Sequence, residues 1–291
     1  MSTELAEWLR LREAADHATR SPELTGAITG ALRGRDHVRI LDLATGTGSN
    51  LRYLVPRLPS SQEWLVVDRS RELLDQLIIR TTVWAVHAGH DVETSEQGLL
   101  IHGSTFRCRV TTLALDLDTL DAAALAGDYD LITASALLDL VSTGWLERLA
   151  TLARHAGAHA LFPINYDGRS SCEPPEPEDE RIRDSLNAHQ HRDKGLGGPA
   201  AGPEAGEAAR SAFAAQGYDV HVRPADWHLD ASHAAMQRVL VDGWAAAALE
   251  LTPGDRAVIE DWHARRLAHI DAGRSRLTVG HLDVAAVHPG R

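Results

Sequence analysis

The chain has 291 residues, 44% of them hydrophobic, and a formal net charge of −12, so it can bury the core of one large domain. Its lysines and arginines form no basic block, which excludes a nucleic-acid partner, because an acidic surface repels a phosphate backbone. No apolar run reaches the roughly 20 residues of a membrane span, so no membrane partner is expected. Cys108 and Cys172, the only cysteines, form no metal motif and fit a reducing compartment; we expect a cytoplasmic protein.

The first 166 residues of the chain have the pattern of strands joined by helices. Residues 1–34 begin with Leu5, Trp8, Leu9 and Arg12 at helical spacing. Residues 35–166 alternate apolar runs with helical stretches, and the expected strands are VRILDLA, EWLVVD, VTTLALD, YDLITAS and HALFPI. A hairpin is expected in GLLIHGSTFRCRV and a short helix in TLDAAALA. This alternation predicts an α/β fold, a doubly wound parallel sheet with helices on both faces.

Residues 167–291 have a different composition but are expected to belong to the same domain. SSCEPPEPEDERIRD and GLGGPAAGPEAG predict loops around one short helix. A helix (EAARSAFAAQG) and a strand (YDVHVRPADW) are expected next, and then two long helices over about 232–250 and 253–272. The final stretch LTVGHLDVAAVH predicts a strand that returns to the sheet. Residues 167–291 therefore add a substrate loop and a helical insertion before the last strand.

The stretch ILDLATGTGSNLRYL combines a strand, a small-residue turn and a helix start, which is typical of a nucleotide-like ligand site. A phosphate-binding P-loop is excluded, because Arg52 stands where that motif requires Lys followed by Ser or Thr. A dinucleotide motif requires a third glycine for close helix packing, and Leu51 is too large for that position. Nicotinamide and flavin cofactors remain the secondary interpretation.

The segment DLATGTG resembles the D-x-G-x-G-x-G signature of class I S-adenosylmethionine-dependent methyltransferases, with Ala44 in place of the first glycine. The resemblance implies a Rossmann-like, seven-stranded, mostly parallel sheet, an N-terminal helical lid, and S-adenosyl-L-methionine as cofactor. It also implies a ribose-binding role for the strand-end carboxylate Asp68, and an adenine-binding role for Asp116 with Leu117. The cofactor-binding residues so implied are Asp42, Ala44, Gly46, Gly48, Asn50, Asp68, Arg69, Asp116, Leu117, Ser135 and Arg20.

The resemblance further implies methyl transfer to a small-molecule acceptor. A base is needed only where the acceptor must lose a proton, and the candidate catalytic residues are Asp139, Tyr166 and His189, with Asp167 and His191 as further candidates. Arg20 or Arg12 is expected to reach the cofactor carboxylate, unless these side chains only form ion pairs on the helix. Trp227 and Trp244 are expected either to line the acceptor pocket or to pack in the core. No metal site is expected.

Two alternatives remain open at the level of the sequence. The fold could use its cofactor structurally, or lack it, and promote a cyclisation or elimination in a biosynthetic pathway. The chain could also be a non-catalytic subunit. Its partner would then be a second copy of the chain or a protein of the same pathway.

Overall fold

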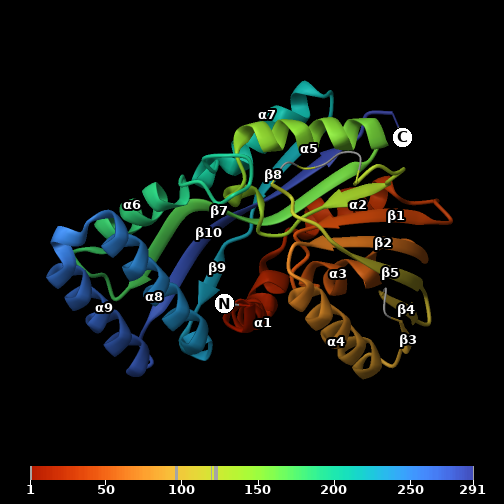
Figure 1. Ribbon diagram of the computed structural model, residues 1–291. Coiled ribbons are helices and arrows are strands. Elements are labelled where there is room, and N and C mark those ends of the chain that lie inside the picture. Colours follow the sequence, from red (N-terminus) through yellow and green to blue (C-terminus); the bar gives the residue numbers. More distant parts are fainter. Residues whose placement is uncertain (1, 96–97, 119, 121–123, 291) are drawn as a thin grey trace.

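The structure, a computed structural model, describes residues 2–95, 98–118, 120 and 124–290 (Figure 1). The strands are β1 (Val38–Leu43), β2 (Ser61–Asp68), β3 (Asp91–Ser95), β4 (Gly98–His102), β5 (Arg107–Ala114), β6 (Leu131–Thr133), β7 (His159–Glu173), β8 (Asp219–Pro224), β9 (Trp227–Leu229) and β10 (Arg276–Val287). They form one sheet in the order β3-β4-β5-β2-β1-β6-β7-β10-β8, and β9 pairs with β10. The five central strands, β5 to β7 in this order, are parallel.

This topology confirms the predicted α/β fold with a parallel centre. The predicted number of seven strands is wrong, since the described residues form a ten-stranded sheet. The additional strands β3, β4 and β9 lie outside the parallel centre. β3 is mostly exposed and β9 has only three residues, so neither carries a long apolar alternation that would predict a strand.

The helices are α1 (Ser2–Thr19), α2 (Pro22–Ala31), α3 (Ser49–Leu54), α4 (Arg71–His87), α5 (Thr143–Ala156), α6 (Asp179–Gln190), α7 (Ala205–Ala215), α8 (Ala234–Leu251) and α9 (Arg256–Asp271). Short 3-10 turns span Val55–Arg57, Leu138–Leu140, Gly202–Glu204, Ala231–His233 and Pro253–Asp255. Residues 119 and 121–123 of the helix expected in TLDAAALA lie outside the described residues, and Ala124 and Leu125 form a turn. No helix within the described ranges combines the length and apolarity of a membrane span.

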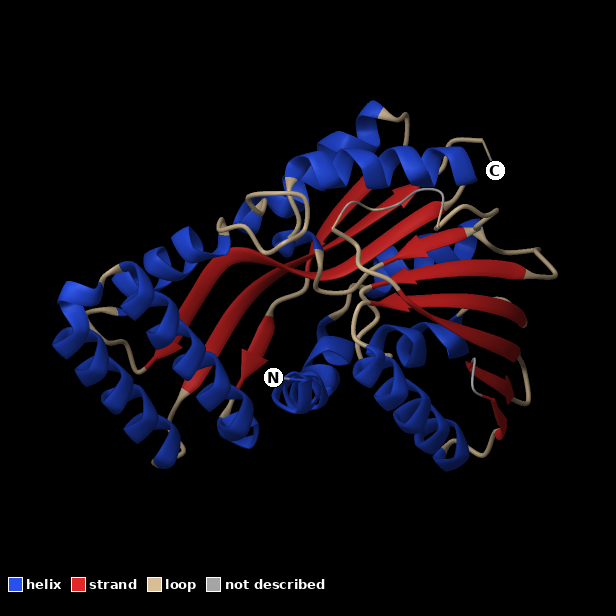
Figure 2. Cartoon of the chain, in the orientation of Figure 1, coloured by secondary structure: helices blue, strands red, loops and turns tan. Residues whose placement is uncertain are grey.

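Helices cover both faces of the parallel strands, as a doubly wound fold requires (Figure 2). Successive β1 side chains point to opposite faces. Leu41 packs in the cluster that includes Trp145 of α5 and Phe213 of α7. Ile40 packs in the opposite cluster with Ile28 of α2 and with residues of α3 and α4.

A cap lies beyond the parallel strands. We define it as α6, α8, α9, β9 and the ends of β7 and β10 that extend past these strands. The strand expected to end at residue 164 continues to Glu173, because β10 pairs with β7 from Arg276 to Ala286. A third apolar cluster fills the cap around Trp262 and Trp244. The predicted segments 1–34, 35–166 and 167–291 all contribute to this one sheet or its covering helices, and their exact boundaries stay a prediction.

Helix α1 lies between the cap and α4 (Figure 1). His17 Nε2 lies 3.0 Å from Ser49 Oγ at the start of α3, and Arg80 of α4 donates to the Ala6 carbonyl at 3.0 Å. On the cap side, Trp8 contacts the ring of Trp227 at 6.1 Å between centroids. The helix therefore covers the carboxyl ends of the parallel strands, where an open α/β sheet binds its ligands.

Candidate active site

The glycine turn after β1 is held in a strongly curved conformation. Gly46 has φ +55° and Gly48 has φ +83°. The Thr45 amide donates to the Val67 carbonyl at 3.0 Å, which ties the turn to β2. A Cβ at Gly48 would lie 2.8 Å from Leu77 Cγ, so that position requires glycine for both space and conformation.

Ala44 also adopts the left-handed conformation, with φ +50°. The backbone at this position uses the freedom of a glycine, although the residue carries a methyl group. This conformation costs an L-residue about 1 kcal/mol. Ala44 packs against the apolar cluster beneath α5, and this contact offsets part of the cost.

Asp42, at the end of β1, is fully buried in a polar cluster. Its carboxylate accepts from Thr45 Oγ1 at 2.6 Å and from Asn50 Nδ2 at 2.8 Å. Asn50 Nδ2 also donates to Thr133 Oγ1 at 3.0 Å, so the cluster joins β1, α3 and β6. Burial raises the pKa of Asp42 to about 6, against the opposing effect of these hydrogen bonds.

Arg20 extends this cluster and is 95% buried, with donors left over. Its Nη1 donates to Asn50 Oδ1 at 2.7 Å, and its guanidinium lies 4.0 Å from the ring centroid of Tyr53. Its Nε and Nη2 find no acceptor among the described residues. Burial lowers the pKa of Arg20 to about 10, while the negative charge of Asp283 acts to raise it. Buried donors without acceptors are costly, so this guanidinium fits a ligand that brings its own carboxylate.

Asp68 ends β2 next to the glycine turn and is 93% buried. Its Oδ2 accepts from the Gly46 amide and its Oδ1 accepts from the Ser70 amide, each at 2.9 Å. A carboxylate has about four acceptor positions, so two remain for ligand hydroxyls. The structure therefore brings Asp42, Gly46, Asn50, Asp68 and Arg20 together, as the sequence predicted for a single site.

The other predicted cofactor residues lie at the same edge of the sheet but outside this hydrogen-bonded cluster. Asp116 is exposed beyond β5 and accepts from the Asp118 amide at 3.1 Å. Leu117 is buried, and its carbonyl accepts from Trp145 Nε1 at 2.7 Å. Ser135 is half-buried beyond β6, and Arg69 is exposed. No hydrogen bond within the described ranges joins these residues to Asp42 or Arg20.

Asp139 lies in the turn after β6 and is 93% buried. Burial raises its pKa to about 6, opposed by a backbone hydrogen bond from Tyr166 and by the charges of Arg12 and Lys194. The Tyr166 hydroxyl donates to Asn187 Oδ1 at 2.8 Å, and burial raises the pKa of that phenol. Of these two predicted catalytic residues, Asp139 is the one whose pKa suits proton transfer near neutral pH.

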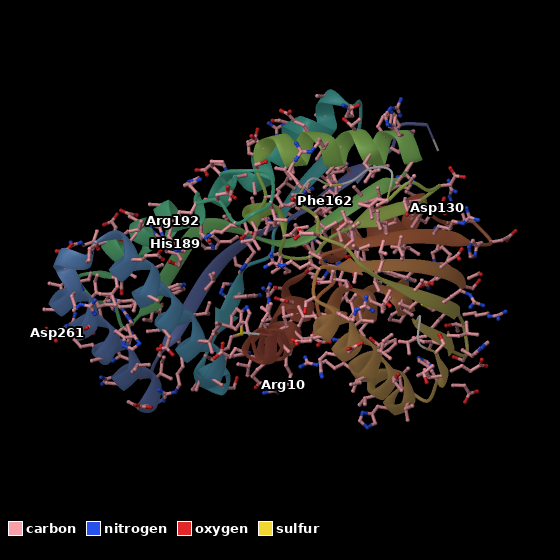
Figure 3. The ribbon with its side chains drawn as sticks, in the orientation of Figure 1. Arg10, Asp130, Phe162, His189, Arg192 and Asp261 are labelled. Carbon is pink, nitrogen blue, oxygen red and sulfur yellow. The ribbon has the colours of Figure 1, made fainter. Side chains whose placement is uncertain are left out.

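His189, the third predicted catalytic residue, lies in α6 of the cap. Its Nε2 lies 3.0 Å from Glu250 Oε2 of α8, and its Nδ1 lies 3.5 Å from Lys194 Nζ. Figure 3 shows His189 close to Arg192, which also pairs with Glu250. No hydrogen bond in the described part of the chain joins His189 to Asp139. No cluster of three or more His, Cys, Asp or Glu suited to a metal ion occurs there either.

Several residues of the site were not predicted from the sequence. Asp283 of β10 is 99% buried and accepts from the amides of Ser21 and Ile164 at 2.7 and 2.8 Å. Asp16 is buried too, and it accepts from Trp227 Nε1 at 3.1 Å and from Arg12 Nε at 2.9 Å. A lone acid within the apolar stretch HLDVAAV was the available signal for Asp283.

Backbone strain gathers at this edge of the sheet. Besides Ala44, Ala136 after β6 has φ +54° and Ile164 in β7 has φ +59°. The left-handed region is a genuine outlier for a β-branched residue such as Ile164. Hydrogen bonds hold both residues, because Ala136 donates to the Pro163 carbonyl and Ile164 donates to Asp283. Strain of this kind is typical of functional sites, where the surrounding structure over-determines the backbone.

Comparison with known proteins gives structural similarity alone. No family model matches the chain, and no curated protein matches it. Among solved structures, a putative methyltransferase from Bacillus halodurans is 12% identical with a TM-score of 0.46, covering 90% of this chain and 97% of its own. YjhP from E. coli is 16% identical with a TM-score of 0.45, covering 97% and 98%.

A third similar structure is a SAM-dependent methyltransferase from Geobacter sulfurreducens in complex with S-adenosyl-L-homocysteine. It is 15% identical with a TM-score of 0.42, covering 91% of this chain and 90% of its own. At these identities and TM-scores the similarities assign no activity. The function is therefore inferred from the residues of this chain.

Proposed function

We propose that the protein is a cytoplasmic S-adenosyl-L-methionine-dependent methyltransferase that acts on a small molecule. The observation that carries this proposal is the buried Arg20, whose Nε and Nη2 have no acceptor among the residues that the structure describes. A cofactor with a free carboxylate would satisfy both donors. The residues present fit such a group, because the buried carboxylates Asp42 and Asp68 line the same site and suit a cationic, ribose-bearing ligand.

Each residue has a distinct part in this proposal. Arg20 would hold the cofactor carboxylate, Asp68 would accept from the ribose hydroxyls, and Asp116 with Leu117 would face the adenine. When bound, the cofactor supplies an electrophilic methyl group on a sulfonium. Asp139 takes the proton that the acceptor must lose, since a buried carboxylate with a pKa of about 6 is mostly ionised at neutral pH yet basic enough to accept it.

Calorimetry with S-adenosylmethionine and S-adenosylhomocysteine tests the proposal. The wild-type protein is expected to bind both, and Arg20→Met to lose roughly tenfold or more in affinity, because two charged hydrogen bonds disappear. Asp68→Ala is expected to weaken binding strongly as well. Arg35→Met is the matched control, since Arg35 pairs with Asp130 and takes no part in the cluster.

The outcomes also separate the alternatives. If the wild-type protein binds neither compound, the methyltransferase proposal fails, and a cofactor-free reaction or a partner subunit remains. If both bind tightly but labelled S-adenosylmethionine transfers no methyl group to any candidate extract, the cyclisation, elimination or subunit alternatives gain support.

A further inference from the structure

A groove between α1, α6 and α8 has the size and lining of a small-molecule site. It encloses about 380 Å³, within the range of ligand pockets. Its walls are mainly apolar, and the residues used here are Trp8 of α1, Leu186 and His189 of α6, and Leu240, Trp244 and Glu250 of α8. We call it the α8 groove.

The polar end of the α8 groove is internally satisfied. An ammonium can only donate, so Lys194 Nζ, 3.5 Å from His189 Nδ1, makes that nitrogen an acceptor. His189 Nε2 then carries the hydrogen and donates to Glu250 Oε2 at 3.0 Å. Arg192 neutralises Glu250 further. Glu250 is thus already paired with His189 and Arg192 and is not free for a cationic ligand, while the apolar walls suit an uncharged occupant.

The elements that form the α8 groove also hold Asp139. Trp8 lies one helical turn before Arg12, whose guanidinium is 5.8 Å from the Trp8 ring centroid and whose charge acts on Asp139. On the α6 side, Asn187 accepts from the hydroxyl of Tyr166, and Tyr166 packs in the same apolar cluster as Trp8, Leu186 and Trp244 of the groove. Lys194, in contact with His189, also acts on Asp139. The same apolar cluster includes Ala136, three residues before Asp139, so the groove walls are continuous with the segment that carries the proposed base.

We propose that the α8 groove binds the acceptor, and that the acceptor is a small, uncharged, largely apolar molecule with a hydroxyl group. The apolar walls bind its body, and the hydroxyl reaches toward Asp139. A cationic amine is disfavoured in the groove, because its walls are mainly apolar and Glu250, the carboxylate among the lining residues, is already paired with His189 and Arg192. This inference rests on the proposed methyltransferase function.

Fluorescence titration with 2-naphthol, a neutral apolar hydroxyl compound, tests the proposal on the full-length protein. Gly243 lines the groove in the middle of α8, and a Cβ there meets no atom within 4 Å, so the side chain of Gly243→Leu starts in open space and takes up part of the groove. Gly26→Leu in α2 is the matched control, since Gly26 is also helical with open space around it. S-adenosylhomocysteine affinity is measured for all three proteins.

We expect Gly243→Leu to weaken 2-naphthol binding by roughly tenfold or more, with Gly26→Leu equal to wild type. We also expect 2-naphthylmethylamine, protonated at neutral pH, to bind more weakly than 2-naphthol. The proposal is overturned if wild type does not bind 2-naphthol, or if Gly243→Leu binds it as tightly as wild type does. It is also overturned if the amine binds more tightly than 2-naphthol. If wild type does not bind S-adenosylhomocysteine, this result counts instead against the proposed methyltransferase function.

Discussion

At the scale of single residues, Ala44 shows how a site can tolerate local strain. Its φ of +50° lies where L-residues with a side chain are disfavoured. The next two residues, Thr45 and Gly46, are fixed to β2 by hydrogen bonds from their amides. These hydrogen bonds therefore hold Ala44 in a backbone conformation that is unfavourable for an alanine by itself.

We predict that Ala44→Gly stabilises the protein by up to about 0.5 kcal/mol, because relief of the left-handed strain slightly exceeds the added entropy of the unfolded chain. Urea denaturation measures this change. Ala214→Gly, on the exposed side of α7, should have the opposite sign, a loss of about 1 kcal/mol. A destabilised Ala44→Gly protein would show that the packing of the methyl group outweighs the strain.

From the buried carboxyl group of Asp139 we predict that the free energy of unfolding depends on pH. Its pKa of about 6 in the folded protein lies above its ordinary value of 3.8, so between these pH values the folded state binds more protons than the unfolded state. Stability from this group therefore falls as pH rises from 4 to 6. The Asp139→Asn protein should lack this loss. Its free energy of unfolding, relative to that of wild type, should therefore rise by up to about 3 kcal/mol between pH 4 and pH 7.

Denaturation curves of both proteins across this pH range measure the effect. Asp128→Asn, which changes an exposed carboxylate, serves as control and should run parallel to wild type. If the difference between Asp139→Asn and wild type stays constant with pH, the carboxyl of Asp139 is not the buried acid that the structure indicates.

At the scale of elements, α1 controls access to the glycine turn. Leu9 packs so closely that a Cβ at Gly46 would lie 3.0 Å from Leu9 Cδ1. Glu13 accepts from Arg52 Nε and Nη2 at 2.8 and 2.7 Å, which fastens α1 to α3. Because Gly46 and Gly48 are buried beneath this helix, a ligand of the turn enters only when α1 moves away.

We predict that Glu13→Gln raises the association and dissociation rates of S-adenosylhomocysteine together, by roughly three- to tenfold, since opening α1 then breaks a weaker contact. Stopped-flow measurement of tryptophan fluorescence checks this, with Trp8 on the moving helix. Glu7→Gln alters an ion pair with Arg10 on the exposed side of α1 and should leave both rates unchanged. Identical rates in Glu13→Gln and wild type would mean that α1 need not open.

The elements also show which parts of the structure the sequence could predict. The proximity of Asp42, Gly46 and Asp68 was predictable, because parallel strands end at one edge and local pattern locates those ends. The extension of β7 to Glu173 was not, because it depends on pairing with β10, more than a hundred residues later in the chain. The left-handed Ile164 and the contact of His189 with Glu250 likewise arise from tertiary packing, which leaves no local pattern.

At the scale of the whole molecule, two long strands connect the core and the cap. β7 and β10 pair from Ala160 with Ala286 in the core to Glu173 with Arg276 in the cap. The same pair of strands thus supports the apolar cluster under α2 and the cluster around Trp262. The cap and the core therefore share two continuous strands, and α1 is the element that we predict to move when a ligand enters.

The position of β10 also sets the order in which the chain can fold during synthesis. β10 inserts between β7 and β8, so β8 and β9 lack their strand partner until Arg276–Val287 has been made. Asp283 of β10 accepts from the Ser21 amide, and its negative charge acts on the buried Arg20. The N-terminal segment therefore gains these contacts only after this late strand has been made. On the ribosome, the ligand site is thus completed only after nearly the whole chain has emerged.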